Sequence, residues 1–305
     1  MVLSVLRRML GSVPTLFALA TITFFVIRFA PGGPFDGEKK LPPALIARME
    51  AQYHLNEPLW QQYLRFLGDV VRLDFGQSMY YREYTVTQLI GHGLPISLQI
   101  GLWATLLYAI AGVTLGVVAA LRRNGILDNL VSAVAMGGIV VPTFVMAPIL
   151  QIVFALMLSL VPVAGWDNGW RSMVLPVVAM ALPNIAYVAR LTRGAMIETL
   201  RSNYIRTARA KGVGEWRVLT HHAIRGAMIP VIAYLGPATA GLITGSMVIE
   251  TIFAVPGIGR YFVESAISRD YTMVMGVTLV YGSCIILFNM VTDVAQMLLD
   301  PRSRT

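Results

Sequence analysis

Six long stretches of this 305-residue chain contain no Asp, Glu, Lys or Arg, and they constrain its fold more than any other feature. Each is close to or above the 18 to 20 residues that an α-helix needs to cross the hydrocarbon core of a bilayer. They span residues 9–27, 96–121, 129–160, 173–189, 227–249 and 273–292. The pattern predicts an all-α membrane protein with about six transmembrane helices.

Composition supports the same fold class. Only 13% of the residues are charged, about half the fraction typical of a soluble domain. The net charge of +8 does not indicate a nucleic-acid partner, because the basic residues are spread between the apolar stretches and form no basic domain. The single cysteine, Cys284, lies in an apolar run and is interpreted as a small buried residue.

The distribution of Lys and Arg predicts the orientation of the chain. With the N-terminus in the cytoplasm, 14 of the 24 basic residues fall on the cytoplasmic side, eight of them in the segment 190–226. The positive-inside rule therefore favours two cytoplasmic termini. The stretch 129–160 is longer than one span needs, and Pro142 and Pro148 lie within it. We interpret it as one span, tilted or broken, since two spans would export the segment 190–226.

The first span follows Arg7 and Arg8, as in a signal peptide, but no A-x-A site precedes Pro31. We therefore expect residues 1–30 to be a retained transmembrane helix. Residues 31–95 form an extracytoplasmic segment, and residues 96–305 form a core of five further spans. Two short helices are expected in the extracytoplasmic segment, one after Leu41 and one capped near Asn56.

The second of these helices carries apolar residues at helical spacing. They are Leu59, Trp60, Tyr63, Leu64, Leu67 and Val71. This stripe either packs on the outer ends of the spans or contacts a delivery protein or substrate. The sequence leaves both interpretations open.

The most informative segment is the basic loop 190–226. Ser202 or Asn203 can cap a short helix over 204–211, and Gly212 is suited to the left-handed position that ends it. Glu215 begins a second helical stretch. From the residues alone, the short helix could rest on lipid headgroups or dock into another protein.

Within this loop, residues 203–212 read N-Y-I-R-T-A-R-A-K-G. This run resembles the cytoplasmic loop motif of binding-protein-dependent ABC permeases, in the form found in the dipeptide and oligopeptide branch. The similarity continues through 217–231, 245–259 and 269–271, and A-P-G-G-P at 30–34 and D-P-R at 300–302 mark its two ends. The outer segment 41–58 is similar to that of the B-type permease of oligopeptide importers.

The resemblance implies the fold of a type I ABC importer permease and a coupling helix that docks into a cytoplasmic ATPase. It assigns this coupling role to Tyr204, Ile205, Arg206, Thr207, Ala208, Arg209, Ala210, Lys211 and Gly212. The general family motif begins Glu-Ala-Ala, where this chain has Arg206, Thr207 and Ala208. The leading Glu is absent, so no salt bridge from it is inferred.

The resemblance further implies a set of partners in the bacterial inner membrane and on both sides of it. They are a related C-type permease subunit, two ATPase subunits that bind ATP and Mg²⁺, and an extracytoplasmic peptide-binding protein. The chain itself is expected to be no enzyme and to hold no cofactor or metal. It has no G-x-x-x-x-G-K-[ST] motif, and its four histidines show no metal-ligand spacing.

Two other places attract attention. Glu250, Pro256, Gly257 and Gly259, with Arg260 and Asp270 nearby, form an external turn between the last two spans, a substrate gate, or a contact with the delivery protein. Asp293, one helical turn after Asn289, is an acid inside an apolar run; it either bonds to another helix or couples a proton.

The preferred function is that of a permease driven by partner ATPases. Its expected substrates are oligopeptides, with dipeptides or nickel complexes as alternatives. An ion-coupled carrier is disfavoured because the spans hold few acids. A membrane enzyme is disfavoured because no nucleophile elbow, zincin helix or carboxylate pair is present.

Overall fold

The computed structural model describes residues 2–35 and 42–299 of the chain. Apart from one isolated antiparallel bridge between Gln77 and Thr85, the regular structure of these residues is helical. The predicted all-α class is therefore confirmed. Leu41 and the D-P-R run at 300–302 lie outside the described residues.

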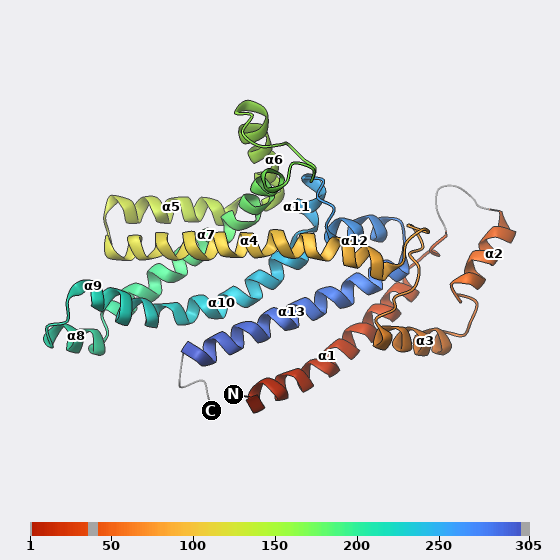
Figure 1. The fold of residues 1–305 in the computed structure, drawn as a ribbon, viewed down its shortest axis with the longest axis horizontal. Helices are drawn as coiled ribbons and strands as arrows, with labels where there is room; N and C mark the ends of the chain where they lie inside the picture. Colours follow the sequence, from red (N-terminus) through yellow and green to blue (C-terminus); the bar gives the residue numbers. More distant parts are fainter. Residues whose placement is uncertain (1, 36–41, 300–305) are drawn as a thin grey trace.

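Five long apolar helices run along the molecule and correspond to five of the six predicted spans (Figure 1). They are α1 (Val2–Phe29), α4 (Val86–Leu121), α7 (Trp170–Leu200), α10 (Ile224–Gly245) continued by α11 (Met247–Ile252), and α13 (Tyr271–Leu299). Several extend past the charge-free stretches, since a helix does not end where the bilayer ends. The 36 residues of α4 are about 54 Å long.

The stretch 129–160 is broken into two helical parts. It contains α5 (Ile126–Val140), α6 (Thr143–Leu150) and a π-helical segment (Gln151–Met157), and the axis bends by 105° between the two parts. Pro142 stands at the break with an extended backbone (φ −60°, ψ 143°). Proline has no amide hydrogen to continue the ladder of α5, which explains the position of the bend.

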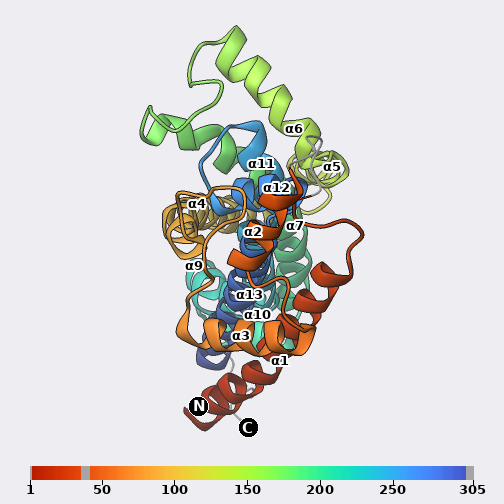
Figure 2. The ribbon, with the colours of Figure 1, turned by 90° about the vertical axis from the view of Figure 1, so that its right-hand side faces the viewer.

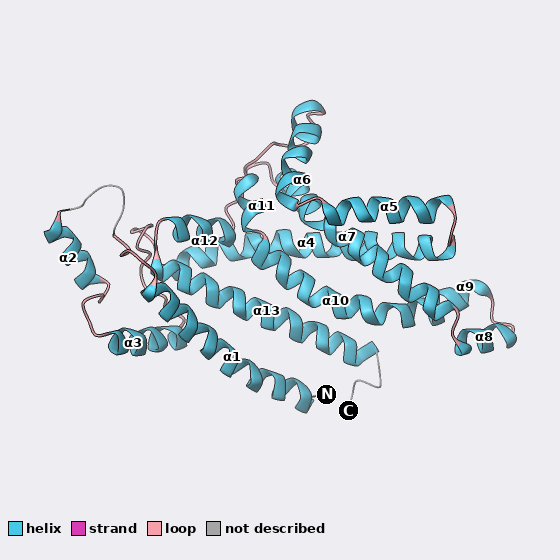
Figure 3. Ribbon diagram, turned by 180° about the vertical axis from the view of Figure 1, so that it is seen from behind, coloured by secondary structure: helices cyan, strands magenta, loops and turns pink. Residues whose placement is uncertain are grey.

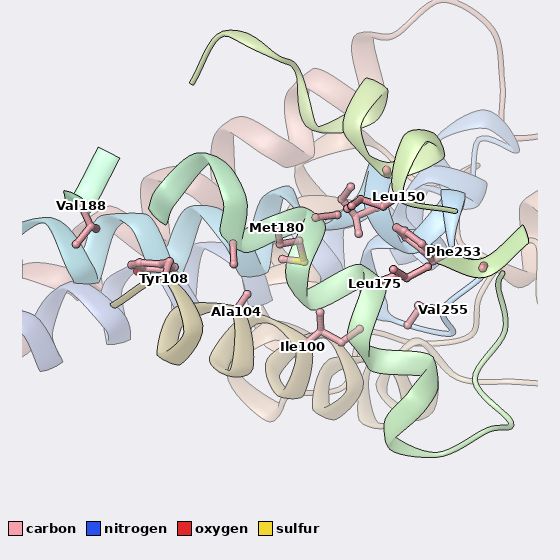
Figure 4. Close-up of a cluster of buried hydrophobic side chains, with 14 of the residues drawn as sticks. Ile100, Ala104, Tyr108, Leu150, Leu175, Met180, Val188, Phe253 and Val255 are labelled. Atoms are coloured by element: carbon pink, nitrogen blue, oxygen red, sulfur yellow. The ribbon is translucent and has the colours of Figure 1, made fainter. Parts of the chain in front are cut away.

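The core of the bundle lies between α4 and α7. Figure 4 shows Ile100, Ala104 and Tyr108 of α4 meeting Leu175 and Met180 of α7, all of them buried. Small residues allow this close approach. A Cβ atom added at Gly116 of α4 would lie 2.5 Å from the carbonyl oxygen of Ala189, so the two backbones nearly touch there.

The elements outside the spans gather at two opposite ends of the bundle (Figures 1 and 3). One end holds α2 (Pro43–Gln52), α3 (Leu59–Arg72) and α12 (Ile258–Ile267), and the other holds α8 (Asn203–Ala210) and α9 (Glu215–Arg217). The start of α1 and the end of α13 point toward the α8 end. The first turn of α1 and the last turn of α13 therefore lie on the same side of the bundle as the basic loop.

Two helix starts at the α3 end differ from expectation. The residue that precedes α3 is Pro58, without a side-chain cap, and Glu57 pairs with Arg65 instead (2.7 Å). That pairing lowers the pKa of Glu57. The helix α12 was not predicted, because it begins within a P-G-I-G run that signals only a turn.

Candidate functional site

The α8 helix is fixed to the bundle by two side chains. Ile205 and Ala208 are buried, one turn apart on the same face, as their spacing predicts. They belong to one buried cluster with Met196 of α7, Ala120 of α4, Ala227 of α10, and Val218 and Ala223 in the turn before α10. Side chains of three spans are therefore part of the cluster that holds α8.

The remaining surface of α8 faces outward. Tyr204, Arg206, Thr207, Arg209 and Ala210 are exposed, as are Lys211 and Gly212 after the helix. Tyr204 is only half exposed, because its hydroxyl lies over Gly226 of α10; a Cβ atom there would be 2.6 Å from that oxygen. The outer side of α8 is therefore basic and exposed, while its inner side is buried against the bundle.

The end of α8 is a Schellman motif, as the sequence predicts. The amide of Val213 donates to the carbonyl of Ala208 (3.2 Å), and the amide of Gly212 donates to that of Arg209 (2.9 Å). Gly212 has φ +76°, in the left-handed region. The predicted left-handed conformation of Gly212 is therefore confirmed.

The start of α8 differs from the prediction in one detail. Ser202 is the N-cap residue, but its hydroxyl donates to the carbonyl of Thr199 (2.7 Å) and makes no bond to the amides of α8. It joins α8 to the last turn of α7 instead. Arg209 braces the other end through both oxygens of Glu215 (2.7 and 3.1 Å), which raises the pKa of Arg209.

An ion pair that the sequence analysis missed joins α5 to α7. Asp128, at the start of α5, is buried and binds the guanidinium of Arg193 on α7 through both carboxylate oxygens. It also accepts the amide of Asn124 (2.8 Å). The pair holds α5 to the part of α7 that leads into α8. Sequence offered little signal, since both residues look like ordinary loop charges.

At the opposite end of the bundle, the turn that contains Pro256, Gly257 and Gly259 is held by a buried carboxyl group. Glu250 has no exposed surface and accepts four hydrogen bonds. The donors are the hydroxyls of Ser97 (2.6 Å) and Ser246 (2.5 Å) and the amides of Gly259 (2.8 Å) and Arg260 (3.1 Å). Ser97 also accepts the amide of Ile258 (2.9 Å), so α4, α11 and the start of α12 meet at this group.

The glycines of this turn allow the close contact. A Cβ atom on Gly257 would lie 2.4 Å from a Glu250 oxygen, and one on Gly259 would lie 2.7 Å from the Cα atom of Met247. Gly259 belongs to the first turn of α12 rather than to a loop. The external turn is therefore part of the packed bundle, and a gate at these residues stays a prediction.

Two further acids have partners in the structure. Asp270, also fully buried, accepts the amides of Tyr80 (3.1 Å) and Met273 (3.0 Å), which fixes the start of α13 to the outer segment. Asp293 on α13 forms an ion pair with Arg8 on α1. The helix-to-helix contact expected for Asp293 is thus confirmed, with a cation as the partner.

Comparison with known proteins agrees with this arrangement. Residues 112–305 match the family described as "Binding-protein-dependent transport system inner membrane component", and residues 1–98 match its N-terminal region. The oligopeptide transport system permease protein OppB of Salmonella typhimurium is 49% identical over 301 residues, 98% of each chain. The dipeptide transport system permease protein DppB of Bacillus subtilis is 42% identical over 297 residues, 97% of this chain and 96% of its own.

Solved structures support the fold. The inward-facing MetNI methionine ABC transporter contains a chain that superposes with a TM-score of 0.56 at 16% identity, covering 70% of this chain and 97% of its own. A second neighbour, an amino acid ABC transporter, superposes with a TM-score of 0.53 at 18% identity, covering 70% and 94%. From the two family matches and the long, highly identical relatives, the chain belongs to the binding-protein-dependent transport system inner membrane components, the multi-pass permeases of type I ABC importers.

Proposed function

We propose that this chain is one of two membrane-spanning permease subunits of an importer that carries oligopeptides across the inner membrane. The observation that carries the proposal is the arrangement of α8: its buried side chains share one cluster with residues of three spans, while its outer surface is exposed and basic. Relatives named as oligopeptide permeases, 44 to 49% identical over 98% of the chain, support the choice of oligopeptides over dipeptides.

In this mechanism, two ATPase subunits bind ATP and Mg²⁺ on the cytoplasmic side, and one of them binds α8. Closure of the ATPases displaces α8, and its contacts with α4, α7 and α10 turn that displacement into a rearrangement of the spans. A related C-type permease completes the pathway, and an extracytoplasmic protein delivers the peptide. The chain itself supplies no cofactor site and no hydrolytic group.

The experiment that tests the substrate is ATPase stimulation in the assembled complex. We expect peptide-loaded binding protein to stimulate hydrolysis with peptides of three or more residues and weakly with dipeptides or a nickel chelate. Stimulation by dipeptides alone would move the chain to the dipeptide class. Failure of the chain to copurify with a second permease and two ATPases would reject the whole proposal.

Orientation is tested separately by labelling intact cells with a membrane-impermeant maleimide in a Cys284→Ala background. We propose that α8 and both termini are cytoplasmic, as the positive-inside rule favours. A cysteine at exposed Glu83 should react in intact cells, whereas one at Lys211 should react only after the membrane is opened. The reverse pattern would invert the topology.

A further inference from the structure

Helix α3 presents three distinct faces. Tyr63 and Phe66 point into the molecule and contact Phe24 of α1: the Phe66 ring stacks on it with centroids 5.5 Å apart, and the Tyr63 ring is tilted against it at 5.3 Å. A second face is polar and exposed, with Gln61, Arg65 and Arg72. The third face lies between them. It is apolar and open, since Trp60 is 62% exposed, Leu64 58% and Val71 84%.

Of the two interpretations that the sequence leaves open for the apolar stripe, packing on the ends of the spans therefore applies only to part of it. The residues Trp60, Leu64, Leu67 and Val71 follow the i, i+4, i+7, i+11 spacing of one helical stripe. Of these, only Leu67 is partly covered. Such a stripe beside a face with two arginines is typical of a helix that lies in a membrane interface.

The position of α3 along α1 shows what covers the open stripe. The hydroxyl of Tyr63 is 2.7 Å from that of Thr21, and its ring also contacts Phe25. Thr21 lies inside the apolar stretch 9–27, eight residues before the end of α1 at Phe29, or about 12 Å along the axis. Helix α3 therefore touches α1 at a level where the surface of α1 must face hydrocarbon.

The surface of α1 around this contact is itself apolar and open. Ile22, Val26 and Phe29 are 61, 63 and 71% exposed. They continue the open apolar side of the first span to the level of α3. Figure 2, which looks along the bundle, shows α3 side-on while α13 and α10 are seen end-on, so α3 crosses the direction of the spans at the edge of the molecule.

We propose that α3 is an interfacial helix and that Trp60, Leu64 and Val71 insert into the bilayer leaflet at that end of the bundle. Arg65 and Arg72 then remain at the level of the lipid headgroups, as long cationic side chains commonly do. This role is separate from transport coupling and from substrate choice. It makes the segment between α1 and α4 a membrane-bound element of the permease.

Spin labelling of the complete complex in lipid nanodiscs tests this proposal. The labelled variants are Leu64→Cys and Val71→Cys on the apolar face, with Gln61→Cys and Arg72→Cys as matched controls on the polar face. All carry Cys284→Ala, and the partner subunits are free of cysteine. Collision rates with O₂, which partitions into lipid, and with a water-soluble nickel chelate are measured at each label.

We expect the ratio of O₂ to nickel collision rates to be at least fivefold higher at positions 64 and 71 than at 61 and 72. Similar ratios at all four positions would place the stripe in water and overturn the proposal. Low collision rates with both reagents at 64 and 71 would show a protein partner there and overturn it as well. As a second measurement, lipids brominated near the headgroups should quench the fluorescence of Trp60. This fluorescence is the difference between the signals of the wild type and the Trp60→Phe variant.

Discussion

At the residue scale, single groups hold the two ends of the permease in place. Gly212 provides the backbone conformation that ends α8, and Glu250 provides the acceptors that hold the turn before α12. Their importance comes from the left-handed backbone conformation of Gly212 and from the hydrogen bonds that the Glu250 carboxylate accepts.

Replacement of Gly212 by valine should uncouple ATP hydrolysis from uptake. A β-branched residue at φ +76° costs about 1 to 2 kcal/mol, although nothing lies within 4 Å of the added Cβ atom. We expect peptide uptake per ATP hydrolysed to fall several-fold in reconstituted complexes. The matched control is Gly212→Asn, because Asn tolerates the left-handed region and should retain most of the coupling. Equal coupling in the valine variant and the wild type would contradict the proposed role.

Replacement of Glu250 by glutamine should destabilise the outer end of the bundle. The amide group has one acceptor oxygen in place of two, so at least one buried donor loses its partner at a cost of about 1 to 3 kcal/mol. Thermal unfolding in detergent should shift to lower temperature, with faster proteolysis after Phe253. The exposed Glu83→Gln variant is the control and should unfold like the wild type. An unchanged unfolding temperature for Glu250→Gln would show that the four bonds contribute little.

At the element scale, the spans are held by close backbone contact. A Cβ atom at Gly116 would meet Ala189 and Thr192 of α7 at 2.5 and 2.6 Å, whereas one at Gly91, also in α4, would meet nothing within 4 Å. Gly116→Ala should therefore destabilise the protein by about 1 to 3 kcal/mol through overpacking. Gly91→Ala should be neutral or slightly stabilising, because alanine favours helix. Thermal unfolding of the two variants provides the comparison, and equal midpoints would argue against tight α4–α7 packing.

Sequence predicted the elements whose signal is local. The charge-free stretches located the spans, and the N-Y-I-R-T-A-R-A-K-G run with Gly212 located α8 and its end. Contacts between distant segments were not predictable. The pair of Asp128 with Arg193 and the four donors to Glu250 depend on how helices pack. The environment of the apolar stripe on α3 was left open for the same reason, since an apolar stripe does not state what covers it.

At the scale of the whole molecule, the bundle joins two different surfaces. The α8 end is basic and exposed, and its buried side chains share one cluster with residues of three spans. The other end is packed around Glu250 and Asp270, two acids without exposed surface. In the proposed importer, ATPase motion enters at the first end and changes access to peptide at the second.

The measurement that tests this account most directly is uptake of a labelled oligopeptide into proteoliposomes that contain the complete complex. ATP is supplied on the α8 side, and peptide with its binding protein on the other side. We predict uptake that requires ATP, the ATPase subunits and the binding protein together, with no stimulation by an ion gradient. Uptake by this chain alone under an ion gradient, or uptake that continues without the ATPases, would contradict the account.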